Sequence, residues 1–301
     1  MTVFNIGSIN IDHLYQVGHF VRPGETLAST QYQQLLGGKG ANQSIAIARA
    51  GGQVCHVGAV FHGDDQVLHS LNNHGVDTSL VAKTDTPTGH AIIQLTPEAE
   101  NAIILYPGAN HSLTQEQISG VLAQTSVEDW VLLQNETNLV LETLQQAAAS
   151  PAQVAFNPAP MDLELTRAAL SYIDLLVVNE VEAMDLTRTE TIEAATTALE
   201  QDFPQLSILL TLGKDGVRYI SHGQNDFVPA FKVEAVDTTA AGDTFIGFYL
   251  AALSEGKAPN AAMTIGCAAS ALCVTRLGAA DVIPTRDEVN QFLAEHPTAS
   301  L

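Results

Sequence analysis

Short apolar runs alternate with longer amphipathic stretches along the chain. The runs have the length and β-branched content of buried strands and lie at residues 3–6, 54–60, 131–133, 154–156, 175–178 and 208–211. Apolar residues recur at helical spacing in residues 41–50, 64–73, 139–149, 192–201, 241–254, 259–274 and 286–294. This order predicts an α/β fold with a mostly parallel central sheet, helices on both faces and a helical C-terminal third.

Two segments depart from this pattern, at about residues 11–36 and 90–106. They alternate polar and apolar positions and contain turn residues such as Pro23-Gly24-Glu25, which predicts strands of a small β lid. With no linker or repeat in between, we expect one domain over residues 1–301 with the lid inserted in it. A lid with an open edge and an apolar face also predicts a homodimer that pairs two lids.

Charge and composition exclude several classes of protein. Apolar residues make up 46% of the chain, which suits a large core, and no stretch reaches the ~18 apolar residues of a membrane span. Twelve Lys and Arg against 33 Asp and Glu give a net charge of −21, which predicts no nucleic-acid or membrane partner. A phosphate site in such a field must rely on metal ions, backbone N–H groups and a few placed cations.

The cysteines Cys55, Cys267 and Cys273 match no metal-binding spacing, and we interpret them as small buried apolar residues. Together with an N-terminal segment that lacks a basic stretch and a long apolar run, they predict a reducing, cytoplasmic location.

The segment Asp237-Thr-Thr-Ala-Ala-Gly-Asp-Thr-Phe245 leads into an apolar helix. A turn of small residues at a helix start exposes backbone N–H groups to an anion, and Ala240, Ala241 and Gly242 leave room for a phosphate. Asp243 lies in the first helical turn, where it can deprotonate an attacking hydroxyl. The alternative is an ordinary capped helix in which Asp243 offsets the helix dipole.

Two earlier segments place polar groups beside predicted secondary structure. Leu36-Gly-Gly-Lys-Gly-Ala-Asn42 precedes a helix without P-loop spacing and can bind a polyol through its backbone, Lys39 and Asn42. Gly7-Ser-Ile-Asn-Ile-Asp12 follows the first strand at its carboxyl end, where ligands bind in open α/β sheets. Each segment is also explained by a glycine-rich turn or a loop cap without any ligand.

These segments, in this order, resemble the ribokinase family of carbohydrate kinases, also called the PfkB family, over essentially the whole chain. Further matching segments are Pro107-Gly-Ala-Asn110, Phe156-Asn-Pro-Ala-Pro160, Asn179-Glu-Val-Glu182 and Thr211-Leu-Gly-Lys-Asp-Gly216. The resemblance implies a ribokinase-like fold and transfer of the γ-phosphoryl group of ATP to a primary hydroxyl of a sugar, with D-ribose the first choice.

The resemblance also implies roles for individual residues. Asp243 would be the catalytic base. The sugar would be held by Asn10, Asp12, Gly38, Lys39, Gly40, Ala41, Asn42, Glu136 and Asp243. ATP would be held by Asn179, Thr211, Leu212, Gly213, Lys214, Asp215, Gly216, Ala240, Ala241, Gly242 and Cys267. Glu182 would orient Mg²⁺ through water, and an activating K⁺ would be bound at Asp237, Thr239, Cys273, Arg276, Gly278 and Val282.

The sequence departs from the family pattern at two of these positions. Cys267 stands where a larger polar residue often lies beside adenine, and Val282 replaces a frequent Ser near the cation. Two alternatives stay open. One is a kinase of the same family for fructose, deoxyribose or a nucleoside; the other is a catalytically inactive sugar-binding sensor, against which Asp243 and Gly242 argue.

Overall fold

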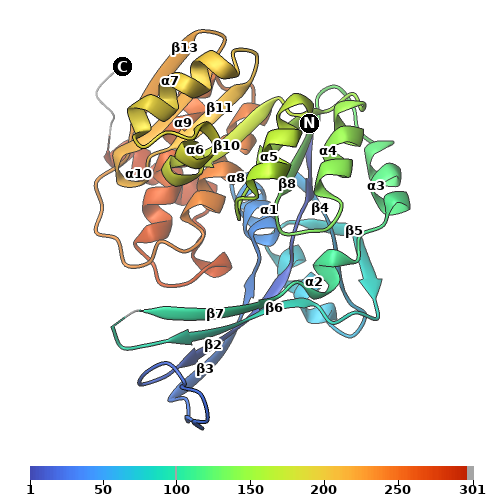
Figure 1. Ribbon diagram of the computed structural model, residues 1–301, viewed down its shortest axis with the longest axis vertical. Coiled ribbons are helices and arrows are strands. Elements are labelled where there is room, and N and C mark those ends of the chain that lie inside the picture. Colours follow the sequence, from blue (N-terminus) through green and yellow to red (C-terminus); the bar gives the residue numbers. More distant parts are fainter. Residues whose placement is uncertain (99, 297–301) are drawn as a thin grey trace.

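The computed structural model describes residues 1–98 and 100–296, which form two β-sheets (Figure 1). The larger sheet has nine strands in the order β13-β12-β11-β10-β9-β8-β1-β4-β5. Their bounds are β1 Thr2–Ile6, β4 Gln53–Phe61, β5 Asp77–Thr84, β8 Trp130–Gln134, β9 Gln153–Asn157, β10 Leu175–Asn179, β11 Ser207–Thr211, β12 Gly216–Ser221 and β13 Gln224–Pro229. Strands β11 to β5 are parallel, whereas β12 and β13 form an antiparallel hairpin at one edge.

Helices cover both faces of this sheet, and a separate apolar cluster fills each side. One face carries α1 (Lys39–Arg49), α2 (Asp65–Asn73), α8 (Ala241–Ser254), α9 (Pro259–Val274) and α10 (Arg286–Glu295). The other carries α3 (Gln115–Leu122), α4 (Val140–Ala148), α5 (Leu163–Ala169), α6 (Glu180–Thr187) and α7 (Ile192–Asp202). Strand periodicity divides the core, since Val3 of β1 faces the first set of helices and Phe4 faces the second.

The smaller sheet has the order β3-β2-β6-β7 and projects from the main body (Figure 1). Its strands are β2 (Asn10–Gln16), β3 (Gln31–Gly37), β6 (Gly89–Leu95) and β7 (Asn101–Tyr106). They lie in the two segments for which the sequence predicts a lid, and we keep that name for this sheet. The predicted fold class, a mostly parallel sheet between helices with a small inserted β sheet, is confirmed.

Several strands of the larger sheet and several of the helices that cover it were not predicted from the sequence. Strands β5 and β13 lie at the two edges of the large sheet, and β5, β12 and β13 carry partly exposed positions that interrupt an apolar run. Helices α3, α5 and α6 have 8, 7 and 8 residues, too few turns for a clear periodic pattern. Within the described residues, none of the helices combines the length and the apolarity needed to cross a membrane.

Candidate active site

The carboxyl ends of the parallel strands meet at one edge of the sheet, and most of the predicted site residues lie there. Residues Ser8 and Asn10 follow β1, Glu136 follows β8, and Asn179 and Thr211 end β10 and β11. Helices α1 and α8, which carry Asn42 and Asp243, begin at this edge and pack on each other. The topology therefore gathers segments from the whole chain at the place where open α/β sheets bind ligands.

Asp243 is the centre of this cluster. It lies in the first turn of α8 and only 8% of its surface is exposed. Asn42 Nδ2 donates to its Oδ2 at 3.1 Å, and Gln43 Nε2 donates to its Oδ1 at 2.9 Å. Both oxygens of the carboxylate are thus held by neutral amide donors from α1, which fixes the plane of the group.

A second carboxylate, Glu136, lies partly buried beside the glycine loop. Its Oε2 accepts from Ser8 Oγ at 2.5 Å and from the backbone N–H of Lys39 at 3.0 Å. Burial raises the pKa of Glu136, although these two hydrogen bonds act in the opposite direction. Glu136 therefore ties the loop before α1 to the turns after β1 and β8.

Asp12 lies in the lid, on strand β2, next to Gly37 of β3. A Cβ atom at Gly37 would lie 2.1 Å from Asp12 Oδ2, so only glycine leaves room for this carboxylate. Burial, and then the nearby charge of Glu136, raise the pKa of Asp12 to about 6. The lid thus brings a carboxylate to the same site as Glu136. Asn10 lies beside it, and its Oδ1 accepts from Asn110 Nδ2 at 2.7 Å.

The glycine loop packs closely on the end of β1. Gly38 has a φ of 93°, a conformation that suits glycine, and a Cβ atom at Gly40 would lie 2.4 Å from the nitrogen of Ser8. Ala41 is fully buried, and its N–H donates to Ser8 O at 2.8 Å. Gly40 and Ala41 therefore support the loop from behind, whereas Gly38 and Lys39 are partly exposed and the buried Asn42 follows them in the first turn of α1.

The turn before α8 has the geometry predicted for an anion site. Ala240 adopts a left-handed conformation, with φ 58° and ψ 7°, and Ala241 begins the helix. The N–H groups of Gly242 and Asp243 belong to the first helical turn, where they have no acceptor within the helix. Gly242 is exposed, and a Cβ atom there would meet nothing within 4 Å. The turn is open to a phosphate next to the Asp243 carboxylate.

Three of the residues predicted for ATP and Mg²⁺ lie at the end of β10, in α6 and in α9. Asn179 and Glu182 form a capping box at the start of α6, with Asn179 N donating to Glu182 Oε2 at 2.9 Å and Glu182 N donating to Asn179 Oδ1 at 3.0 Å. Burial raises the pKa of Glu182. Cys267 of α9 is 7% exposed, and burial raises the pKa of its thiol to about 12, so it contributes packing rather than charge.

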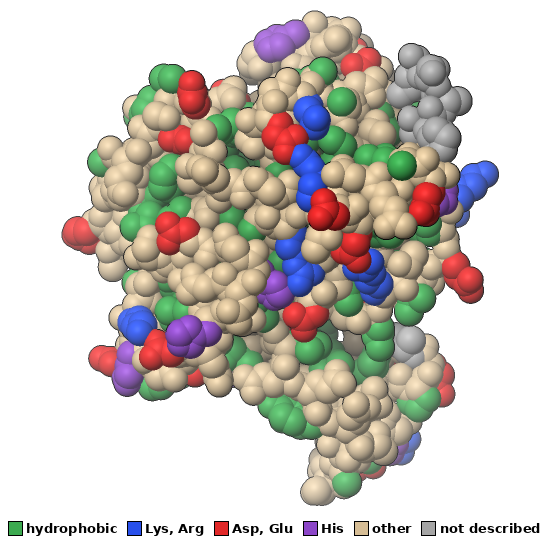
Figure 2. All heavy atoms as spheres, turned by 180° about the vertical axis from the view of Figure 1, so that it is seen from behind, with side chains coloured by type: hydrophobic (Ala, Val, Ile, Leu, Met, Phe, Trp, Pro, Cys, Tyr) green, Lys and Arg blue, Asp and Glu red, His purple; other side chains and the backbone are tan. Residues whose placement is uncertain are grey.

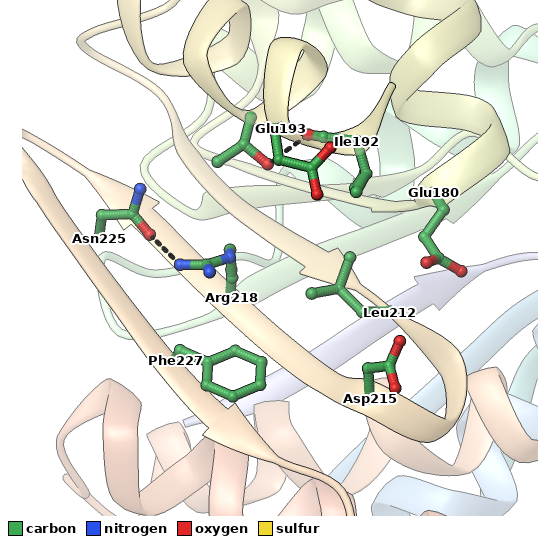
Figure 3. Close-up of a pocket in the computed structure, with 9 residues that line it drawn as sticks. Glu180, Ile192, Glu193, Leu212, Asp215, Arg218, Asn225 and Phe227 are labelled. Carbon is green, nitrogen blue, oxygen red and sulfur yellow. Dashed lines mark hydrogen bonds between the residues drawn. The ribbon is translucent and has the colours of Figure 1, made fainter. Parts of the chain in front are cut away.

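Residues 211–216 connect β11 to β12 through a short 3-10 turn, Gly213–Asp215. Figure 3 shows a groove on the outer side of this turn, where Leu212 and Asp215 face α7 and the β12–β13 hairpin. Arg218 lies 5.1 Å from the ring centroid of Phe227 and donates to Asn225 there. Asp243 and the glycine loop do not line this groove, so it is a separate hollow.

The six residues predicted for a monovalent cation come together around Asp237. Its Oδ1 accepts from N and Oγ1 of Thr239, at 2.9 and 2.7 Å, and its Oδ2 accepts from Gly278 N at 3.1 Å. The Cys273 thiol donates to the Thr239 carbonyl at 3.7 Å. Arg276 donates to the Val282 carbonyl at 3.4 Å, and a methyl group of Val282 packs near Gly278.

Comparison with known proteins agrees with this geometry. The model of the pfkB family carbohydrate kinases matches residues 2–286. The chain belongs to this family. The ribokinase of Haemophilus influenzae is 38% identical over 308 residues, which cover 98% of this chain and 99% of that protein.

Solved structures of family members superpose over nearly the whole chain. The ribokinase of Thermotoga maritima is 36% identical, with a TM-score of 0.87 over 98% of this chain and 99% of that one. The ribokinase of Arabidopsis thaliana, solved with ribose and ATP, is 28% identical with a TM-score of 0.87, covering 97% and 98%. The resemblance inferred from the motifs is therefore confirmed.

Sequence reasoning missed part of the site of this pfkB-family chain. Ser8 bonds directly to the Glu136 carboxylate, Gln43 bonds directly to that of Asp243, and Asn110 supports Asn10. Behind them, Asn5 and Gln134 lie fully buried in strands that are otherwise apolar. Their signal in the sequence is a polar residue inside a predicted buried strand for Asn5, and directly after one for Gln134. Burial of such a residue is costly unless it is hydrogen-bonded, so it points to a site.

Proposed function

We propose that this protein is a ribokinase, which transfers the γ-phosphoryl group of ATP to the primary hydroxyl of D-ribose. The observation that carries the proposal is Asp243, a buried carboxylate held by two amide donors beside the open turn at Ala240–Gly242. Support comes from the ribokinases to which the chain is similar over nearly its full length.

The sugar would lie between the glycine loop and the lid. Asn10, Asp12, Glu136 and the backbone of Gly38 and Lys39 offer donors and acceptors to adjacent hydroxyls. Asn42 supports this placement, because its Oδ1 is buried and none of the described residues donates a hydrogen bond to it. A substrate hydroxyl is a fitting donor for that atom, since a buried amide oxygen without a partner is costly. The buried Gly40 and Ala41 would act by shaping the loop.

The reaction follows from the position of Asp243. Its carboxylate accepts the proton of the primary hydroxyl as the hydroxyl oxygen attacks the γ-phosphorus. A new P–O bond forms to the sugar, the bond to the β-phosphate oxygen breaks, and ADP leaves with that electron pair. The N–H groups of Gly242 and Asp243 would hold the oxygens of the transferred group.

ATP would extend from this turn toward residues 211–216, with Asn179 near the phosphates and Thr211 to Gly216 and Cys267 near the nucleoside. The described residues contain no cluster of three His, Cys, Asp or Glu side chains able to hold a metal ion. This suits Mg²⁺ that is bound mainly by phosphate oxygens and water, with the half-buried Glu182 hydrogen-bonding one of its waters. Mg²⁺ would offset the phosphate charge.

A monovalent cation would bind beside Asp237, among the carbonyl groups of Thr239, Cys273, Arg276 and Gly278. Its place, next to the turn that leads to Gly242, suits an activator that orders this turn. K⁺ suits a shell of carbonyl oxygens, and water would stand in where Val282 offers no side-chain oxygen.

The lid supports a homodimer. Strand register places Asp12, Leu14, Ile93, Ile103 and Leu105 on one face, because facing residues in paired strands share a side. Ile103 and Leu105 are 56% and 52% exposed. Figure 2 shows hydrophobic side chains on the surface of the lid, at the bottom of the view. A second lid would cover this face, so one copy would border the other's sugar site.

The three buried free cysteines and the use of ATP suit a cytoplasmic enzyme.

A coupled ADP-release assay over pentoses, hexoses, deoxyribose and nucleosides tests the function. We expect the highest kcat/KM with D-ribose. A higher value with fructose, deoxyribose or a nucleoside would make the protein a kinase for that substrate. Sugar binding without ADP release would make it a sensor.

A further inference from the structure

We propose that Gln43 is a positioning residue that orients the Asp243 carboxylate for proton transfer. This inference rests on the proposed kinase function. Gln43 is fully buried, and its Nε2 lies 2.9 Å from Asp243 Oδ1. Its neighbour Asn42 is also buried and also donates to Asp243, but Asn42 Oδ1 has no donor among the described residues, whereas the oxygen and both amide hydrogens of Gln43 are hydrogen-bonded within the protein. We therefore expect Gln43 to act through Asp243 and not on the sugar.

A row of buried polar side chains runs across the sheet beneath α1. His56 of β4, Asn5 of β1, Gln134 of β8 and Asn157 of β9 are 0 to 7% exposed and lie on the sheet face that carries α1 and α8. Polar groups at this depth stabilise the fold less than apolar ones of the same size. Gln134 and Asn157 bond directly to Gln43, and Asn5 bonds to Gln134, which indicates that this part of the row supports the site rather than only the core.

The hydrogen bonds allow only one orientation of the Gln43 amide. The carbonyl of Gly40 can only accept, so Asn5 turns its Nδ2 to it at 2.8 Å and its Oδ1 to Gln134. Gln134 Nε2 then donates to Asn5 Oδ1 at 2.9 Å and to Gln43 Oε1 at 2.7 Å. With Oε1 facing Gln134, Gln43 must present its Nε2 to Asp243.

A second backbone carbonyl, on the other side of Gln43, requires the same orientation. Asn157 Nδ2 donates to Val177 O at 3.0 Å, so its Oδ1 faces Gln43 and accepts from Nε2 at 3.1 Å. Both hydrogens of Gln43 Nε2 are used, one by Asn157 and one by Asp243. Two independent anchors, Gly40 O and Val177 O, thus direct one N–H group of Gln43 at Asp243 Oδ1.

A neutral donor such as the Gln43 amide, held in this way, suits the role of Asp243 as a catalytic base. It fixes the rotation of the carboxylate, and so the direction of the lone pair that receives the proton, without the full counter-charge of a Lys or Arg. Misplacement of a reacting group by about 1 Å costs on the order of 100-fold in rate. Loss of the Gln43 donor should therefore lower kcat and leave substrate affinity nearly unchanged.

The test is Gln43→Met, which keeps the length of the side chain and removes both its donor and its acceptor. We expect kcat to fall roughly 10- to 100-fold, with KM for sugar and for ATP within about threefold of the parent. In an Asp243→Asn background the same change should alter the residual kcat by less than about threefold, because the carboxylate it orients is absent. A purely structural role would lower the rate by the same factor in both backgrounds.

Two further variants keep the test sharp. Gln117→Met is the matched control, because Gln117 Nε2 also donates two hydrogen bonds, to Gly58 O and Leu80 O, far from Asp243. It should lower the melting temperature without changing kcat. Gln134→Met leaves Gln43 in place without its orienting donor, so its kcat should also fall, and it replaces Gln43→Met as the test if that variant does not fold.

Three outcomes would overturn the proposal: a folded Gln43→Met protein with kcat within threefold of the parent, a rise in KM with kcat unchanged, or equal losses in the two backgrounds. Each of these leaves the kinase function standing. A parent protein without sugar-dependent turnover would contradict the proposed function and the positioning role together.

Discussion

Asn42 donates a hydrogen bond from Nδ2 to Asp243 Oδ2 at 3.1 Å, across a separation of 201 residues in sequence. The bond joins the first turn of α1 to the first turn of α8, and the two helices pack directly on each other. A Cβ atom at Gly247 of α8 would lie 2.3 Å from Ala46 Cβ of α1, so glycine permits this approach. The proposed sugar loop and phosphoryl turn are therefore parts of one rigid unit.

We expect Asp12→Ala to raise KM for the sugar much more than KM for ATP, because Asp12 lies in the lid at the proposed sugar site. Loss of a hydrogen bond to a charged group costs ~1.5–3 kcal/mol, or roughly 10- to 150-fold in affinity. Steady-state kinetics with each substrate varied in turn measure both constants. Asp202→Ala is the control, since Asp202 is exposed at the end of α7, before the amino end of β11. A rise confined to KM for ATP would show that the sugar site and the ATP site have been assigned the wrong way round.

Sugar capture should weaken in acid. Burial raises the pKa of Asp12 from its ordinary 3.8 to about 6, so below about pH 6 the free enzyme carries a protonated Asp12, which is a poorer acceptor for sugar hydroxyls. The pH profile of kcat/KM for the sugar should therefore fall below about pH 6, and Asp12→Asn should lower its plateau and remove most of this limb. A parent profile that stays flat down to pH 5 would contradict the assignment.

Ile103 and Ile104 offer a matched pair for testing the proposed dimer. They are adjacent and similarly exposed, at 56% and 64%, but only Ile103 shares the lid face of Asp12. We expect a dimeric parent, a monomeric Ile103→Lys variant and a dimeric Ile104→Lys variant in sedimentation velocity. A monomeric parent, or dissociation by the Ile104 change alone, would show that this lid face is not the interface.

Potassium should activate the enzyme more than sodium, through the site beside Asp237. Val282 supplies no side-chain oxygen, so water must fill one ligand position and binding should be weak. In a Val282→Ser variant the hydroxyl can take that position, and half-saturation should occur at a lower K⁺ concentration. Titration of both proteins with KCl and with NaCl at constant ionic strength measures this. Equal rates in the two salts for both proteins would contradict the assignment of a cation site beside Asp237.

The central strands could be predicted because their residues are buried on both faces, which leaves runs such as residues 131–133 without polar interruption. Strand β5 could not, because an edge strand such as Asp77–Thr84 is exposed along much of its length. The pairing of β2 with β6 was equally hidden, because register depends on segments about 80 residues apart and not on local pattern.

In the site, motifs identified the residues proposed to bind the substrates, while the support behind them came only from the structure. Nothing local distinguishes Asn42 from Gln43 in sequence, yet Asn42 Oδ1 has no donor among the described residues, whereas the Gln43 amide is fully hydrogen-bonded within the protein. Asn5 and Gln134 belong to strands that are predicted from the apolar residues beside them. Their hydrogen bonds join four separate elements, and no periodicity within one element encodes such contacts.

The most direct test of the account is the identity of the product. Parent protein and an Asp243→Asn variant are incubated with ATP, Mg²⁺ and ¹³C-labelled D-ribose, and the products are followed by ¹³C and ³¹P NMR. We predict one new phosphomonoester coupled to C5 of ribose, formed in step with ADP, and a rate lower by ~10²–10⁴-fold in Asp243→Asn. Phosphorus attached to C1, ADP formed without a phosphorylated sugar, or an Asp243→Asn rate within about threefold of the parent would contradict the account.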